Sequence, residues 1–146
     1  TLSLKGQAGW ISNKNVDSFF HFYLGGIPGV RGYPFYSIQG TKSALLDATF
    51  RMPIFMEKHY KAKWIIFQNS TLGAVIQIGD AWTEDISIKK SVGIQWRING
   101  FSFYNFPTAI EVEYHQPLDT FKREINETTI PYGENGRAYV KVLFDF

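Results

Sequence analysis

Short stretches of alternating apolar and polar residues, separated by Gly, Pro, Asn and Asp, run through most of this 146-residue chain. A period of two is typical of β-strands, because successive side chains point to opposite faces of a sheet. No helical stripe longer than a few residues interrupts the pattern, so the sequence predicts an all-β fold. The expected strands, with ends placed to within about 2–4 residues, cover residues 2–11, 17–24, 43–53, 72–81, 91–103, 109–115 and 137–146, and residues 64–67 either extend the fourth strand or form a short piece.

Three of these expected strands have one apolar and one polar face. The apolar positions in two of them are Val92, Ile94, Trp96 and Ile98, and Ala138, Val140, Val142, Phe144 and Phe146. A soluble sandwich would turn such positions inward, whereas a membrane barrel would turn them outward to lipid. The aromatic share of 17% fits the girdles of a barrel as well as ordinary sheet surfaces. The alternation alone does not decide whether the apolar face points inward to a core or outward to lipid.

The strand count bears on whether such a sheet is complete. About seven antiparallel strands fall short of the roughly eight in the smallest single-chain membrane barrels. An open sheet in lipid would leave backbone N–H and C=O groups unpaired along two edges. If the sheet spans a membrane, residues 1–146 are therefore the carboxy-terminal portion of a barrel whose other strands lie upstream or in another chain. A soluble sandwich needs no such partner.

Several classes of function are disfavoured by composition. Cysteine is absent, and the three histidines stand apart without metal-ligand spacing, so we expect no metal site and no cofactor. The net charge of +2 and the scattered basic residues give no footprint for nucleic acid. Glu111 and Glu113 share one strand face, as catalytic carboxylates can, but such pairs are commonplace on wet surfaces. We expect no enzyme.

A long connection, residues 25–40, separates the second and third expected strands. It combines glycines and prolines with several apolar and aromatic residues, so it can turn sharply and also bury surface. We expect an ordered loop folded inward.

Within this loop, Val30-Arg31-Gly32-Tyr33 resembles the Val-Arg-Gly-Phe/Tyr motif of the BamA/TamA superfamily of outer-membrane barrels, the bacterial surface-antigen family. Residues 48–54 (Ala-Thr-Phe-Arg-Met-Pro-Ile) are similar to that family's E-x-R-F-P strand end. Residues 73–82 (Gly-Ala-Val-Ile-Gln-Ile-Gly-Asp-Ala-Trp) are similar to its F-x-D-A-G-x-x-W strand. The terminal segment resembles a carboxy-terminal recognition signal of outer-membrane proteins, carried by Tyr139, Val142, Phe144 and Phe146. The spacing from Pro53 to Gly73 and the turn over residues 101–107 are similar to those of the subgroup in which the barrel follows a TolB-like propeller.

The resemblance implies a loop latch inside the barrel lumen, in which Arg31 pairs with Asp80. The family's usual glutamate is replaced by Thr49, and Asp47 on the same face is the candidate second acid. The implied function is assembly, insertion or translocation of polypeptides at the bacterial outer membrane. The expected partners are the lipid bilayer, the remaining barrel strands, client polypeptides and envelope assembly factors. The alternatives are a soluble β-sandwich binding module, with a closed core around Val92, Ile94, Val140 and Val142 and Arg31 in solvent, and a passive outer-membrane pore.

Overall fold

The computed structural model describes residues 1–13, 15–55, 60–103, 106–125 and 128–144. Its main element is one antiparallel sheet whose strands run in the order β1-β4-β6-β7-β8-β11, with β5 paired to β6. The bounds are β1 Leu2–Trp10, β4 Lys42–Phe55, β5 Tyr60–Ala62, β6 Ile65–Trp82, β7 Lys89–Ser102, β8 Phe106–Pro117 and β11 Arg137–Phe144. The all-β prediction is confirmed.

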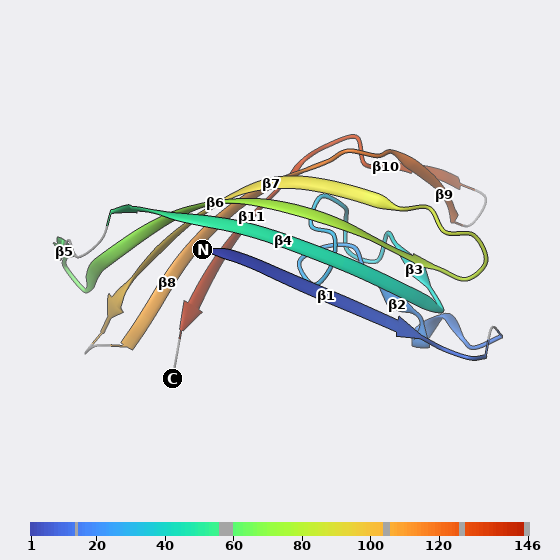
Figure 1. Cartoon of the computed structure of the whole chain (residues 1–146), viewed down its shortest axis with the longest axis horizontal. Coiled ribbons are helices and arrows are strands. Elements are labelled where there is room, and N and C mark those ends of the chain that lie inside the picture. The colour runs from blue at the N-terminus through green and yellow to red at the C-terminus, as the bar shows by residue number, and fades with distance from the viewer. Residues whose placement is uncertain (14, 56–59, 104–105, 126–127, 145–146) are drawn as a thin grey trace.

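The sheet is curved, and the segment between β1 and β4 lies under its concave side (Figure 1). This segment contains a 3-10 helix, Ser18–Phe20, and a two-stranded ladder of β2 (Phe22–Tyr23) and β3 (Gln39–Gly40). A second small ladder, β9 (Phe121–Ile125) with β10 (Thr128–Tyr132), projects beyond the end of the sheet at which β6 ends and β7 begins. We call this end the loop end.

Six of the seven expected strands belong to the main sheet, and the residues at 65–67 extend the fourth, which runs from Ile65 to Trp82. The expected strand over residues 17–24 is wrong. Asp17 accepts a hydrogen bond from the backbone N–H of Phe19 and caps the 3-10 turn, and β1 pairs directly with β4, so no place remains between them. The short ladders were not predicted.

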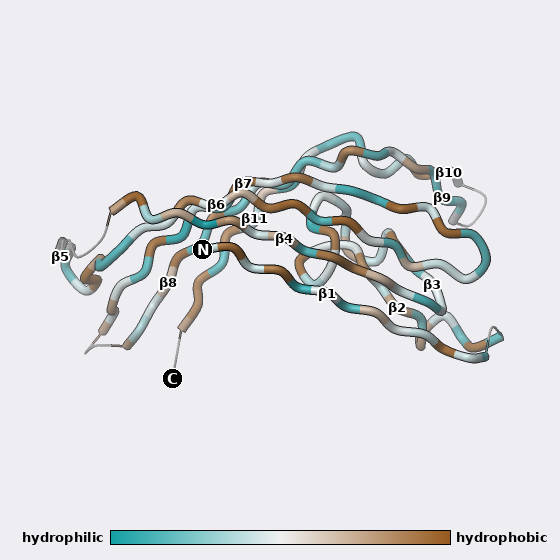
Figure 2. The backbone as a smooth tube through the Cα atoms, viewed as in Figure 1, coloured by the Kyte–Doolittle hydropathy of each residue, from teal (hydrophilic) through white to brown (hydrophobic). Residues whose placement is uncertain are grey.

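The outer, convex face of the sheet is apolar. Three consecutive cross-strand rows contain no charged residue. Six of the positions expected on the apolar face are 37–71% exposed, namely Val92, Ile94, Trp96, Val140, Val142 and Phe144. The rows are Leu2, Phe50, Ala74, Ile94, Tyr114 and Ala138; then Met52, Leu72, Trp96, Val112 and Val140; then Ser70, Ile98, Ile110 and Val142. Colouring by hydropathy shows the alternation along β4, β6 and β7 (Figure 2).

The inner, concave face carries the charges. Its rows, read in the same way, include Lys5, Asp47, Gln77 and Ser91; then Arg51, Gln95, Glu113 and Tyr139; then Arg97, Glu111 and Lys141. Many of these side chains are buried, among them Asp47, Gln77 and Glu113. The core around Val92, Ile94, Val140 and Val142 that a soluble sandwich requires is not the arrangement observed.

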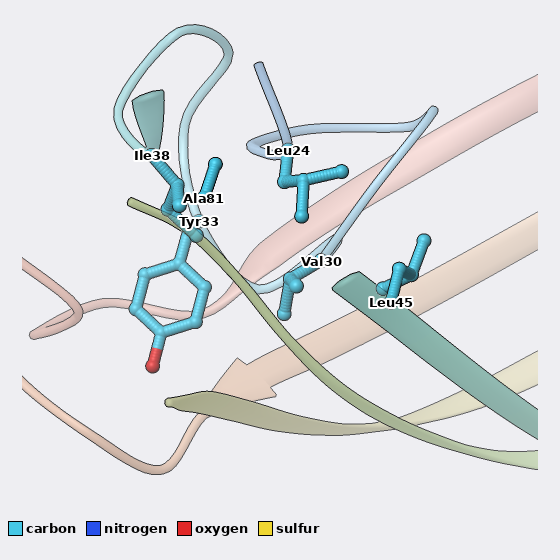
Figure 3. Close-up of a cluster of buried hydrophobic side chains, with 6 residues drawn as sticks. All are labelled: Leu24, Val30, Tyr33, Ile38, Leu45 and Ala81. Atoms are coloured by element: carbon cyan, nitrogen blue, oxygen red, sulfur yellow. The ribbon is translucent and has the colours of Figure 1, made fainter. Parts of the chain in front are cut away.

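The buried apolar cluster is small and lies between the loop and the sheet, with contributions from both. Its members are Leu24, Val30, Tyr33, Ile38, Leu45 and Ala81 (Figure 3). The core therefore fixes the loop to the inner face and is not the interior of a sandwich.

Among the described residues, no helix is long and apolar enough to span a membrane.

Candidate functional site

The loop between β2 and β3 is folded back on itself by its own backbone. Val30 N–H donates to the carbonyl of Leu24 at 2.6 Å, and Gly26 N–H donates to the carbonyl of Tyr33 at 2.9 Å. Leu24 N–H bonds to the carbonyl of Ile38 at 3.0 Å, which closes the base of the loop. These bonds confirm an ordered loop, and its burial against the sheet confirms that it folds inward.

Gly32 allows the loop backbone to touch the sheet. A Cβ atom built there would lie 2.8 Å from Cβ of Ser91 and 2.9 Å from the backbone nitrogen of Pro117. Any side chain would push the loop away from β7 and β8. The close approach of the loop backbone to β7 and β8 thus explains why the motif has glycine at this position.

Arg31 binds the inner face through both its side chain and its backbone. Its Nη1 donates to Oε1 of Glu113 at 3.1 Å, and its Nη2 lies 3.4 Å from Oδ2 of Asp47. The Arg31 N–H donates to Oε1 of Gln77 at 2.9 Å, and its carbonyl accepts the hydroxyl proton of Tyr139 at 2.8 Å. One residue therefore connects the loop to β4, β6, β8 and β11.

The carboxylates that receive Arg31 are held by further partners. Glu113 also accepts from Gln95 at 3.1 Å, lies 2.9 Å from Nζ of Lys141 and contacts Nε2 of His115 at 3.2 Å. Asp47 accepts from Nε2 of Gln77 at 2.7 Å and from the Thr49 hydroxyl at 2.9 Å. A buried charge is stable only when paired and hydrogen-bonded in this way.

Tyr33 anchors the other side of the motif. Its side chain is fully buried, and its hydroxyl lies 2.8 Å from the carbonyl of Asp119 and 3.2 Å from that of Lys90. Burial raises the pKa of the Tyr33 phenol from 10.0 to about 12. The phenol therefore keeps its proton at physiological pH and remains a donor to the ends of β7 and β8.

The predicted pair of Arg31 with Asp80 is wrong. Asp80 instead lies 2.8 Å from Nζ of Lys89 and accepts from the backbone N–H of Ser87. Side chains of β6 alternate between the two faces, so Asp80 is in phase with Ile76 and Ile78 on the outer face, whereas Gln77 is on the inner face. The β4–β6 ladder has no register shift near Asp80 that would change this. The predicted partner Asp47 is confirmed.

Two other expectations change. Lys89 precedes the expected strand over residues 91–103, where a lysine is ordinarily solvated, but it is 8% exposed and paired with Asp80. Glu113, interpreted as one of two carboxylates on a wet surface, is 1% exposed and is the main partner of Arg31. The signal was present in the alternation, because Val112 and Tyr114 on the outer face place Glu113 on the inner one. A signal for Gln77 was present as well, because the F-x-D-A-G-x-x-W pattern aligned on Gly79 and Trp82 places its acidic position on Gln77.

Most residues of the expected carboxy-terminal signal lie on β11. Val142 and Phe144 are on the outer face, and Tyr139 reaches inward to the Arg31 carbonyl. Phe146 lies outside the described residues. In the part of the chain that is described, no group of three or more His, Cys, Asp or Glu side chains could hold a metal ion.

The comparisons with known proteins give no relatives. No family model, no curated protein and no solved structure matches the chain. The site must therefore be interpreted from its own geometry.

We predict that Arg31→Ala lowers the free energy of unfolding by about 3–5 kcal/mol, nearer the smaller figure because Lys141 still neutralises Glu113. Arg137→Ala is the matched control, since Arg137 is exposed and changes at such sites are within about 0.5 kcal/mol. Chemical denaturation of the protein measures both. Arg31→Lys should recover only part of the loss, because lysine lacks the planar fork of donors. Equal effects of Arg31→Ala and Arg137→Ala would contradict the geometry.

A second prediction concerns the ion pair of Asp80 and Lys89. Lys89→Ala leaves a carboxylate that is 2% exposed without its cation, so it should cost about 3–5 kcal/mol. The neighbouring Lys90 is exposed, and Lys90→Ala should change stability by no more than about 0.5 kcal/mol. Adding Asp80→Asn to Lys89→Ala should restore part of the stability, since the uncompensated charge is then removed. The same denaturation curves test this, and an additive double variant would count against it.

Proposed function

We propose that this chain is the carboxy-terminal part of an outer-membrane β-barrel of the BamA/TamA type, which inserts or translocates polypeptides. The observation that carries the proposal is the distribution of polarity: charges line the concave face, where an arginine loop binds them, and apolar side chains cover the convex face. A barrel in lipid requires this distribution, and a protein in water requires the opposite one.

The polar atoms of the outer face are also suited to lipid. The indole N–H of Trp96 donates to the hydroxyl of Ser70 at 2.8 Å, and the hydroxyl of Tyr114 donates to Oε1 of Gln116 at 3.0 Å. A hydrogen-bond donor without a partner in hydrocarbon costs several kcal/mol. These groups need no water to be satisfied.

The two edges of the sheet support incompleteness. In the described part of the chain, β1 and β11 each pair with one strand only, β4 and β8. In lipid each free edge would leave a row of backbone groups unpaired, so further strands must cover both. The proposed partners are strands that precede this segment or come from another chain, together with the bilayer.

Polypeptide handling is the step that rests on the resemblance of the motifs. The arrangement of Val30, Arg31, Gly32 and Tyr33 supports it, because these four residues hold the loop against the inner face by burial, ion pairs, close approach and a phenol bond, respectively. Client polypeptides and assembly factors are proposed partners on the same ground.

The membrane assignment predicts the reactivity of single cysteines, and the chain has no cysteine of its own. Ile94→Cys and Val140→Cys, introduced into the full-length protein in its membrane, should resist a bulky water-soluble maleimide because lipid covers them. Glu134→Cys, at an exposed position near the loop end, should react fully. All three should react after denaturation. Free labelling of Ile94→Cys in the intact membrane would overturn the assignment.

The activity is predicted to appear on reconstitution. Full-length protein in liposomes should speed the conversion of an unfolded outer-membrane barrel to its protease-resistant form, relative to empty liposomes. Arg31→Ala should slow this conversion, while Arg137→Ala should leave it close to wild type. Liposomes that leak small solutes without any gain in folding would indicate the passive pore instead.

A further inference from the structure

A cavity of about 390 Å³ lies at the loop end, separate from the contacts of Arg31. It is bounded by the loop, the end of β6, the start of β7 and the small strand β9. The polar residues that line it are His21, Ser37, Gln39, Thr83, Lys89, Lys122 and Arg123. Three are cationic, and no aspartate or glutamate is among the described lining residues.

A chain of hydrogen bonds fixes the proton on His21. Arg123 Nη2 contacts Oε1 of Gln39, and because a guanidinium only donates, this contact sets the orientation of the amide. The amide nitrogen of Gln39 then donates to Nδ1 of His21 at 2.9 Å. Neutral His21 must therefore carry its proton on Nε2. That atom is buried, and no acceptor for it exists among the described residues.

Other donors around the cavity lack anionic partners as well. Arg123 Nη1 binds two neutral acceptors, the carbonyls of Tyr36 at 2.9 Å and Ser37 at 3.3 Å, and the described residues give Arg123 no ion pair. Lys122 is exposed and likewise has none within that part of the chain. The Thr83 hydroxyl accepts from the Thr41 N–H at 3.3 Å, which leaves its proton free to donate.

The charge of Lys89 is compensated by Asp80, at 2.8 Å. The lining therefore presents two uncompensated cations, Lys122 and Arg123, together with the free hydroxyl donor of Thr83, while the unpartnered Nε2 of His21 is buried in the wall of the cavity. A doubly charged anion with several acceptor oxygens satisfies this set, whereas a carboxylate would neutralise only one cation. Ile38 and Phe121 add apolar lining beside the charges.

We propose that this cavity binds a phosphate monoester, with the phosphate at Thr83, Lys122 and Arg123 and a group about the size of a sugar in the remaining space. The inference is independent of the proposed membrane function, because every residue that it uses lies outside the long strands except Lys89. Either a soluble sugar phosphate or a lipid headgroup would present the same phosphate chemistry.

Calorimetric titration of the full-length protein in detergent tests the proposal, with glucose 6-phosphate as probe and glucose as control. We expect saturable binding of glucose 6-phosphate only. Lys122→Gln should weaken it by about tenfold, as loss of one charge-assisted hydrogen bond does. Lys61→Gln, an exposed lysine at the other end of the sheet, should leave the affinity unchanged. In labelled protein the His21 Nε2 resonance should shift on addition of inorganic phosphate.

Nanodiscs distinguish the two sources of phosphate. If phosphatidic acid in phosphatidylcholine discs weakens glucose 6-phosphate binding by competition, the site takes a lipid phosphate; if it has no effect, the site takes a soluble ester. The proposal is overturned if binding is absent, or if Lys122→Gln and Lys61→Gln weaken it equally, which would show only diffuse attraction. Because Lys122 is exposed, its substitution tests the site without threatening the fold.

Discussion

The guanidinium of Arg31 needs two carboxylates from strands that are not neighbours, and the shape of the sheet follows from this need. Asp47 on β4 and Glu113 on β8 are separated in the sheet by β6 and β7. Asp47 lies in the cross-strand row of Pro117, four residues from Glu113, so at about 4.8 Å per strand and 3.4 Å per residue a flat sheet would hold the two acids roughly 20 Å apart. Curvature brings both within reach of one side chain, and Gln77 and Gln95 fill the interval with amides that bond to the acids. Loop and curvature therefore depend on each other.

The same constraint explains why the apolar core is small. A sheet that keeps its charges on the concave side cannot gather its large apolar side chains there, so the buried apolar cluster is limited to six residues of the loop and the sheet beneath it. Stability on the inner face comes instead from paired charges and amides, which direct the loop to one position because few others provide these partners. The apolar outer face is left to its surroundings, and this is the physical basis of the proposal that it meets lipid.

The strands and the inward loop could be predicted because each rests on a local pattern. Alternation placed Val92, Ile94 and Val140 on one face, and the resemblance of the loop motif selected Arg31 and Asp47. The choice of Asp80 as partner was wrong because the F-x-D-A-G-x-x-W pattern, aligned on Gly79 and Trp82, puts its acidic position on Gln77, whereas Asp80 lies in the phase of Ile76. Glu113 was misjudged because the direction of the apolar face remained open, and a carboxylate is wet or buried according to that direction. Tyr139 acts through a contact across 108 residues, which no local pattern contains.

The hydroxyl of Tyr139 has a consequence for the order in which the protein matures. Arg31 precedes Tyr139 by 108 residues, yet Tyr139 donates to the Arg31 carbonyl, and Lys141 on the same strand lies 2.9 Å from Glu113, the carboxylate partner of Arg31. Contacts so distant along the chain close slowly, because the ends of a long segment must first meet. Until β11 pairs with β8, the arginine motif lacks these two partners. Docking of β11 therefore adds a strand to the sheet and secures the loop in the same step.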